Sequence, residues 1–154
     1  MEDVHLPPCG LYRTLRAVGA IPSGRLVYFH NHGDPGPGLY LPSSWIGNRA
    51  RFEERGVTLP SPADVAALEP LAREGFYRVV EPFHCCERKC VLFEAEALVQ
   101  LGYDAQATPI VFVPEIVDGM LGLPERGTRI DREQVRKMHL LHVRVADGDR
   151  SVTH

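Results

Sequence analysis

The tetrapeptide Gly10-Leu-Tyr-Arg13 recurs as Gly75-Phe-Tyr-Arg78, and this pair of segments organises the chain of 154 residues. At the same offset of 65 residues, Leu26-Val-Tyr28 lies over Val91-Leu-Phe93. Self-similarity at one fixed offset is typical of repeated structural units. The matches therefore predict an internal duplication, with chance similarity as the alternative.

A third match extends this pattern towards the middle of each half. Leu39-Tyr-Leu-Pro42 resembles Leu121-Gly-Leu-Pro124, and each is followed by a segment that reads as a helix. This match requires a longer insertion in the second half. We expect the second repeat to carry extra chain between its first strands and its last hairpin.

Glycine and proline punctuate the whole chain, with 14 and 13 copies, which favours short strands joined by turns over a helical bundle. We predict a mainly β protein with a few short helices, a β-rich member of the α+β class. The duplication would form small SH3-like open barrels or one pseudo-symmetric β structure. The expected parts are a first β-rich repeat at 1–56, a connector with a short helix at 57–74, a second β-rich repeat packed on the first at 75–146, and a flexible tail at 147–154.

Local signals place the other elements. Two hairpins are expected, one with a long loop at Gly33–Gly38 and one with a tight turn at Asp118-Gly119. Tyr12 and Tyr77, at matching repeat positions, are expected in the core. Three helices are predicted: Arg49–Arg55 after an Asn48 cap, a helix that is capped by Ser61 and that Pro70 bends or ends, and Arg132–Leu140 after Asp131. The segment Phe93–Tyr103 is ambiguous, because its alternating apolar residues favour a strand and its Ala and Glu residues favour a helix. We predict a strand there.

Composition and charge exclude several classes of protein. The net charge is −3 and the basic residues are scattered, so we expect no nucleic-acid partner. No apolar run approaches the roughly 20 residues of a membrane helix, so we expect no membrane partner. The acidic N-terminus lacks an apolar signal region, which favours a cytoplasmic protein whose cysteines are thiols or metal ligands. Phosphate-binding glycine loops and the serine-hydrolase elbow are absent from the sequence.

The stretch Glu81-Pro-Phe-His-Cys-Cys-Glu-Arg-Lys-Cys90 holds three of the four cysteines. The repeat register places this stretch at the end of a hairpin. Because alternate residues of a strand share a face, His84 and Cys86 should point together while Cys85 points away. Cys90 on the returning strand and Cys9 would complete a set of nitrogen and sulfur ligands of the kind that binds Zn²⁺. The alternatives are a redox-active pair of Cys86 with Cys90, or a buried small cysteine beside surface thiols.

A second pattern of metal ligands follows the first long strand. His30 and His32 share one face and Asp34 follows, so the H-x-H-x-D spacing could form half of a metal site. Over five residues it resembles the start of the metallo-β-lactamase-type motif H-x-H-x-D-H, which implies metal-dependent hydrolysis, but Pro35 stands where that motif has its last His. The other interpretation is that these polar side chains bond the backbone of the following loop.

The loop after this strand is also a candidate binding surface, because prolines lower the entropy that a loop loses when it docks a partner. We define this surface by His30, His32, Asp34, Pro35, Pro37 and Trp45. Trp45, the single tryptophan, could be a core residue or an interface anchor.

No complete catalytic set is identifiable in the sequence. The first functional prediction is therefore a non-enzymatic binding protein, either an adaptor or an assembly subunit with a protein partner or copies of itself, and without a cofactor. The second is a small metalloprotein, with a structural zinc site or a metal-dependent hydrolytic centre. Elemental analysis separates the two.

Overall fold

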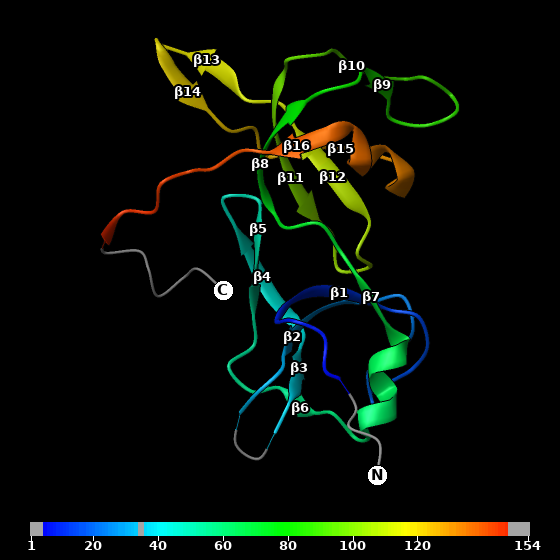
Figure 1. The fold of residues 1–154 in the computed structure, drawn as a ribbon. Coiled ribbons are helices and arrows are strands. Elements are labelled where there is room, and N and C mark those ends of the chain that lie inside the picture. Colours follow the sequence, from blue (N-terminus) through cyan, green and yellow to red (C-terminus); the bar gives the residue numbers. More distant parts are fainter. Residues whose placement is uncertain (1–4, 34–35, 148–154) are drawn as a thin grey trace.

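The computed structural model describes residues 5–33 and 36–147. It is mainly β, with several sheets and two short 3₁₀ helices, and no closed barrel is found among the described residues. Two five-stranded antiparallel sheets, one from each half of the chain, lie one above the other in Figure 1. The mainly β prediction is confirmed. No helix in the described part of the chain is long and apolar enough to cross a membrane.

The first sheet has the strand order β6-β3-β2-β1-β7. Its strands are β1 (Gly10–Thr14), β2 (Leu26–His30), β3 (Gly38–Tyr40), β6 (Val57–Thr58) and β7 (Leu68–Pro70). The pairing of β2 with β3 is the predicted long-looped hairpin. A 3₁₀ helix, η1 (Pro62–Ala67), leads into β7, and the Ser61 side chain accepts a hydrogen bond from the Ala63 N–H. The predicted Ser61 cap is therefore confirmed, although the helix is 3₁₀ and ends before Pro70.

The second sheet has the strand order β15-β12-β11-β8-β16. Its strands are β8 (Gly75–Val79), β11 (Leu98–Tyr103), β12 (Pro109–Phe112), β15 (Thr128–Arg129) and β16 (Met138–Leu140). The helix η2 (Arg132–Lys137) begins after Asp131 as predicted. It differs from the prediction in being a 3₁₀ helix and in having no side-chain cap from Asp131. It also ends earlier than predicted, because the strand β16 begins at Met138. Of the strand predicted over Phe93–Tyr103, the part from Leu98 forms β11, Phe93 ends a separate short strand, and residues 94–97 are not in a strand.

Three two-stranded hairpins stand beside the main sheets. They are β4 (Pro42–Ile46) with β5 (Arg49–Phe52), β9 (Phe83–His84) with β10 (Leu92–Phe93), and β13 (Glu115–Val117) with β14 (Met120–Gly122). The helix predicted at Arg49–Arg55 is therefore wrong. Gly47 and Asn48 have φ of +59° and +65°, which is the geometry of a tight hairpin turn and not of a helix cap. The predicted turn at Asp118-Gly119 is confirmed, with φ of +50° and +78°.

The strand order of the two sheets does not agree with two of the three sequence matches. In the second sheet β11 takes the place that β2 has in the first, and β12 takes the place of β3. Val91-Leu-Phe93 and Leu121-Gly-Leu-Pro124 lie outside these strands, in or beside the small hairpins. The first match agrees with the strand order, because β1 and β8 occupy the same place in their sheets and are 65 residues apart in the sequence.

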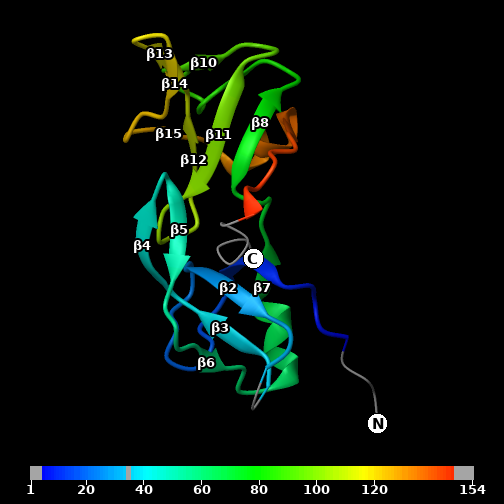
Figure 2. The same ribbon diagram turned by 90° about the vertical axis from the view of Figure 1, so that its left-hand side faces the viewer.

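Two apolar clusters form the core, one in each half. Tyr12 and Tyr77 are buried in them, as predicted. The second cluster also contains Leu26 and Ala50 from the first half, so the two cores are joined. Figure 2 shows the hairpin β4–β5 reaching from the first sheet to the second. The hairpin thus forms much of the junction between the halves.

Candidate functional site

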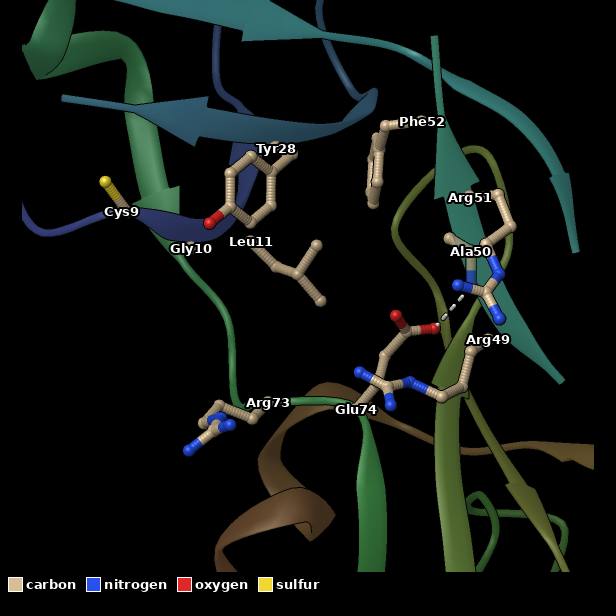
Figure 3. A pocket seen from close by; sticks show the side chains of 10 residues that line it. All are labelled: Cys9, Gly10, Leu11, Tyr28, Arg49, Ala50, Arg51, Phe52, Arg73 and Glu74. Atoms are coloured by element: carbon tan, nitrogen blue, oxygen red, sulfur yellow. Dashed lines mark hydrogen bonds between the residues drawn. The ribbon is translucent and has the colours of Figure 1, made fainter. Parts of the chain in front are cut away.

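A cavity of about 300 Å³ lies at this junction. Figure 3 shows its lining, which consists of Cys9, Gly10, Leu11, Tyr28, Arg49, Ala50, Arg51, Phe52, Arg73 and Glu74. The rings of Tyr28 and Phe52 lie 5.7 Å apart and provide an apolar wall. The opposite wall carries three guanidinium groups and one carboxyl group. A cavity with an aromatic wall and convergent charged groups is typical of a binding site.

Glu74 is the titratable group that this cavity changes most. Burial raises its pKa to about 7, while a hydrogen bond from the Ala50 N–H and the charges of Arg49 and Arg51 oppose the shift. The Ala50 nitrogen lies 3.0 Å from the Glu74 carboxylate. Sequence reasoning missed Glu74. A usable signal was its place directly before the repeated tetrapeptide, where the first half has Cys9.

The positive charges of the arginines favour the binding of an anion in the cavity. Among the residues that the structure describes, the Arg51 Nε is a buried donor without a hydrogen-bond partner. Guanidinium groups bind carboxylates and phosphates through paired hydrogen bonds. The cavity is therefore suited to an acidic group attached to an apolar body, whether on a small molecule or on a protein segment.

Cys9 lies at the edge of this cavity and also belongs to a group of metal ligands. Its Sγ is 3.3 Å from the Nδ1 of His30 and 4.0 Å from the Nδ1 of His32. All three ligand atoms lie within 4.8 Å of one another. The pairing of β1 with β2 explains the approach, because Gly10 lies opposite Phe29 and brings the preceding Cys9 beside His30.

The amide of Asn31 organises this group. Its side-chain oxygen is 3.2 Å from the Cys9 Sγ and 2.9 Å from the His32 Nδ1, and its backbone N–H donates to the Cys9 Sγ at 3.3 Å. The Asn31 side-chain nitrogen donates to the carbonyl of Pro7. The Cys9 thiol donates to the Asn31 side-chain oxygen, so binding of a metal ion would replace this hydrogen bond, whereas the bond from the Asn31 N–H to the sulfur could remain.

The prediction of a shared face for His30 and His32 is confirmed, since their ring centroids lie 3.9 Å apart. Asp34 and Pro35 lie outside the described residues. Pro37 is half-buried, and its carbonyl accepts a hydrogen bond from the Leu59 N–H. Cys9 therefore lies with His30 and His32, whereas the sequence predicts it as a ligand beside Cys86 and Cys90.

Trp45 lies at the junction between the halves. The indole is 41% exposed, so it is not a core residue, and its N–H donates to the carbonyl of Tyr103 in the second half at 2.8 Å. This hydrogen bond gives Trp45 a contact between the two halves of the chain.

The other three cysteines, Cys85, Cys86 and Cys90, form a second group. They lie in the loop between β9 and β10, so the prediction that they lie at the end of a hairpin is confirmed. Their sulfurs lie within 4.8 Å of one another. The prediction that Cys85 points away is wrong, since its Sγ is 3.6 Å from the Cys86 Sγ. His84, which pairs with Leu92 in the strand ladder, is not a member of the group.

Comparison with protein-family models, with curated proteins and with solved structures finds no match. The chemistry of the two ligand groups and of the cavity is therefore the basis for a function.

Proposed function

We propose that this protein is a non-enzymatic metal-binding protein that holds a Zn²⁺ ion between Cys9, His30 and His32. The observation that carries the proposal is the convergence of one sulfur and two imidazole nitrogens from segments 21 and 23 residues apart. In a tetrahedral site, zinc lies about 2.3 Å from a sulfur ligand and about 2.0 Å from a nitrogen ligand, so the sulfur and the nitrogen lie about 3.5 Å apart. The two sulfur–nitrogen distances, 3.3 and 4.0 Å, bracket that value.

The geometry favours a binding role over hydrolysis. Three protein ligands leave a fourth position, which in hydrolytic zinc sites holds an activated water beside a general base. Within the described residues, no carboxylate belongs to the group of Cys9, His30 and His32. The ion would instead tie the segment that precedes β1 to the end of β2. Metal binding then contributes directly to folding, because the unfolded chain lacks the assembled site.

Zinc titration against a chromophoric chelator tests this proposal. We would use a chain without an affinity tag in which Cys86→Ser and Cys90→Ser remove two of the three thiols of the second group. We expect one zinc ion per chain and a rise of several degrees in the melting temperature on adding zinc. Adding Cys9→Ser should abolish both effects, whereas the exposed control His142→Ala should retain both. Zinc binding that survives Cys9→Ser and His30→Ala would overturn the proposal.

We also infer that the two halves arose by duplication of one SH3-like unit. In both sheets the strand with the repeated tetrapeptide pairs on one side with the next long strand and on the other with the strand after the 3₁₀ helix. Such an antiparallel sheet with a 3₁₀ turn before its last strand is the arrangement we associate with SH3-like barrels, here left open.

The registers support the duplication residue by residue. Tyr12 pairs with Val27, and Tyr77 pairs with Val99. The Tyr12 hydroxyl donates to the carbonyl of Pro8 and the Tyr77 hydroxyl to that of Arg73, in both cases four residues upstream, at 2.7 and 2.6 Å. A shared hydrogen bond of this kind is unexpected between unrelated sheets.

A second candidate function, self-assembly, rests on the exposed apolar hairpin β13–β14. Ile116 and Met120 are 70% and 74% exposed, and the hairpin projects from the second sheet at the top of Figure 1. In the duplication its counterpart is β4–β5, which docks on the second sheet through Trp45 and Asn48. A large exposed apolar surface is typical of an interaction site. The partner that fits is a second copy of this chain, and the oligomeric state tests it.

A further inference from the structure

The thiols of Cys85, Cys86 and Cys90 occupy a loop whose backbone already points an N–H group at sulfur. The Val91 N–H donates to the Cys85 Sγ at 3.3 Å. The Cys85 thiol lies within hydrogen-bonding distance of the Cys86 Sγ, at 3.6 Å. Loops that bind metal through cysteine are tuned by such hydrogen bonds to sulfur. The loop therefore already has one such backbone hydrogen bond to sulfur.

The turn that closes the loop is also defined. The Lys89 N–H donates to the Cys86 carbonyl at 2.9 Å, and Lys89 has φ of +55°, a left-handed conformation that reverses the chain and returns Cys90 towards Cys86. Cys85 is buried in the second core cluster, and its carbonyl accepts a hydrogen bond from the Asp131 N–H. The sulfurs are therefore positioned by the core on one side and by the turn on the other.

We propose that Cys85, Cys86 and Cys90 bind one soft metal ion through three thiolates. Two sulfurs at about 2.3 Å from a common three-coordinate ion lie about 4.0 Å apart, and the 3.6 Å between Cys85 and Cys86 is about 0.4 Å shorter than this. The group supplies three sulfurs and, among the described residues, no nitrogen or oxygen ligand. Soft cations such as Cu(I) prefer this kind of ligand set, whereas zinc in proteins takes four ligands.

Electrostatics explain why a cation is needed. Thiolates this close repel one another, because the three sulfurs lie within 4.8 Å of one another. Three ionised thiols are stable together only when a cation lies between them, and binding of the ion releases their protons to solvent. Arg88 and Lys89 add positive charge beside the site.

Titration with Cd²⁺ under nitrogen tests the proposal, because cadmium thiolates absorb in the ultraviolet. The Cys9→Ser variant is the starting protein, so that the first site does not contribute and the two proposals can fail separately. We expect an absorption band that saturates at one Cd²⁺ per chain. Adding Cys90→Ser should reduce the band by about a third or more and weaken binding at least about 10-fold, because even the loss of an outer-shell partner of a metal ligand costs about 10–100-fold in affinity. His84→Ala should leave both unchanged.

A second measurement guards against a variant that fails to fold. In the Cys9→Ser chain, Cd²⁺ or Cu(I) should protect all three remaining thiols from alkylation, with circular dichroism unchanged. Absence of the band, a band that keeps its full intensity after Cys90→Ser, or thiols alkylated equally fast with and without the ion would overturn the proposal. A Cys86–Cys90 disulfide in protein purified without oxidant would also overturn it.

Discussion

Glu74 has an unusual environment for a carboxyl group, because it is buried at the junction while Arg49 and Arg51 lie nearby. Burial dominates and raises the pKa to about 7, from an ordinary value of 4.5. A raised carboxyl pKa means that folding favours the protonated form. The carboxyl group therefore costs no stability at pH values below the unfolded pKa. The cost grows from about pH 4.5 to about pH 7, where the unfolded state loses its proton first, and is then constant.

We predict that Glu74→Gln is more stable than the wild-type chain at alkaline pH. Gln keeps an oxygen that can accept the Ala50 N–H but carries no charge. The shift in pKa corresponds to about 3 kcal/mol, so we expect a gain of about 2 kcal/mol near pH 8 and almost none near pH 4. Urea unfolding at several pH values measures this difference. The exposed control Glu115→Gln should show no such trend, and a gain for Glu74→Gln that is equal at all pH values would contradict the account.

Individual ligand residues could be predicted from the sequence, but their grouping could not. Cys9, His30 and His32 were each identified as candidate ligands, yet Cys9 was assigned to the wrong partners. The pairing of Gly10 with Phe29 closes that distance, and pairing register depends on the whole sheet. Cys85 was excluded by assuming regular strand alternation, which does not hold in the loop where it lies.

The hairpin β4–β5 is the element that sequence reasoning misassigned. Asn48 before a charged run is typical of a helix cap, but Asn also adopts the left-handed conformation that a two-residue hairpin turn requires. The decisive contacts are distant in sequence. The Asn48 side chain donates to Gln100 and to the Pro124 carbonyl, and the Gln100 side chain donates to the Gly47 carbonyl. Local propensity contains no information about such contacts.

This docking makes Gly102 critical, and we predict that Gly102→Ala separates the hairpin from β11. An added methyl group would lie 2.7 Å from the Asn48 carbonyl oxygen and 3.3 Å from the ring of Phe112. We expect a loss of about 2 kcal/mol in the free energy of unfolding, as for overpacked sites, and a red shift of the fluorescence of Trp45.

Urea unfolding monitored by tryptophan emission measures both effects, since Trp45 is the single tryptophan. Gly36→Ala is the matched control, because its added methyl group meets open space. If Gly102→Ala were as stable as Gly36→Ala, with the same emission, the hairpin would not depend on this close approach.

At the scale of the whole molecule, the glycine and proline content predicts the mainly β class and the repeated tetrapeptide predicts a duplication, but the later alignments do not follow the strands. Residues 80–97 join β8 to β11, whereas the shorter segment 15–25 joins β1 to β2. The longer connection contains the cysteine loop and shifts the register after β8. Strand order, and not residue identity, therefore gives the argument for duplication.

The proposed duplication also predicts where β13–β14 would dock. The first hairpin docks on β11 near Gln100, and the residue at the equivalent register position of β2 is Tyr28. Tyr28 lines the cavity that Arg49, Arg51 and Arg73 make positive. The second hairpin carries Glu115 and Asp118 beside its apolar residues, so its charge complements this cavity. A hairpin from one copy in the cavity of the next is a head-to-tail contact, which propagates into a ring or a filament.

We predict that the chain self-associates with increasing concentration and that Met120→Glu weakens this association at least about 10-fold, because burying an apolar side chain of this size contributes roughly 1.5–3 kcal/mol. Sedimentation velocity over a range of concentrations measures the effect. Leu92→Glu is the control, since Leu92 is also an exposed apolar residue, but on the hairpin β9–β10.

Exchanging charges provides a specific test of the contact. Glu115→Lys or Arg73→Glu alone should weaken association and the two together should restore it, because the opposite charges would again face each other across the contact. A wild-type chain that is monomeric at its highest soluble concentration, or a Leu92→Glu effect equal to that of Met120→Glu, would exclude this head-to-tail contact.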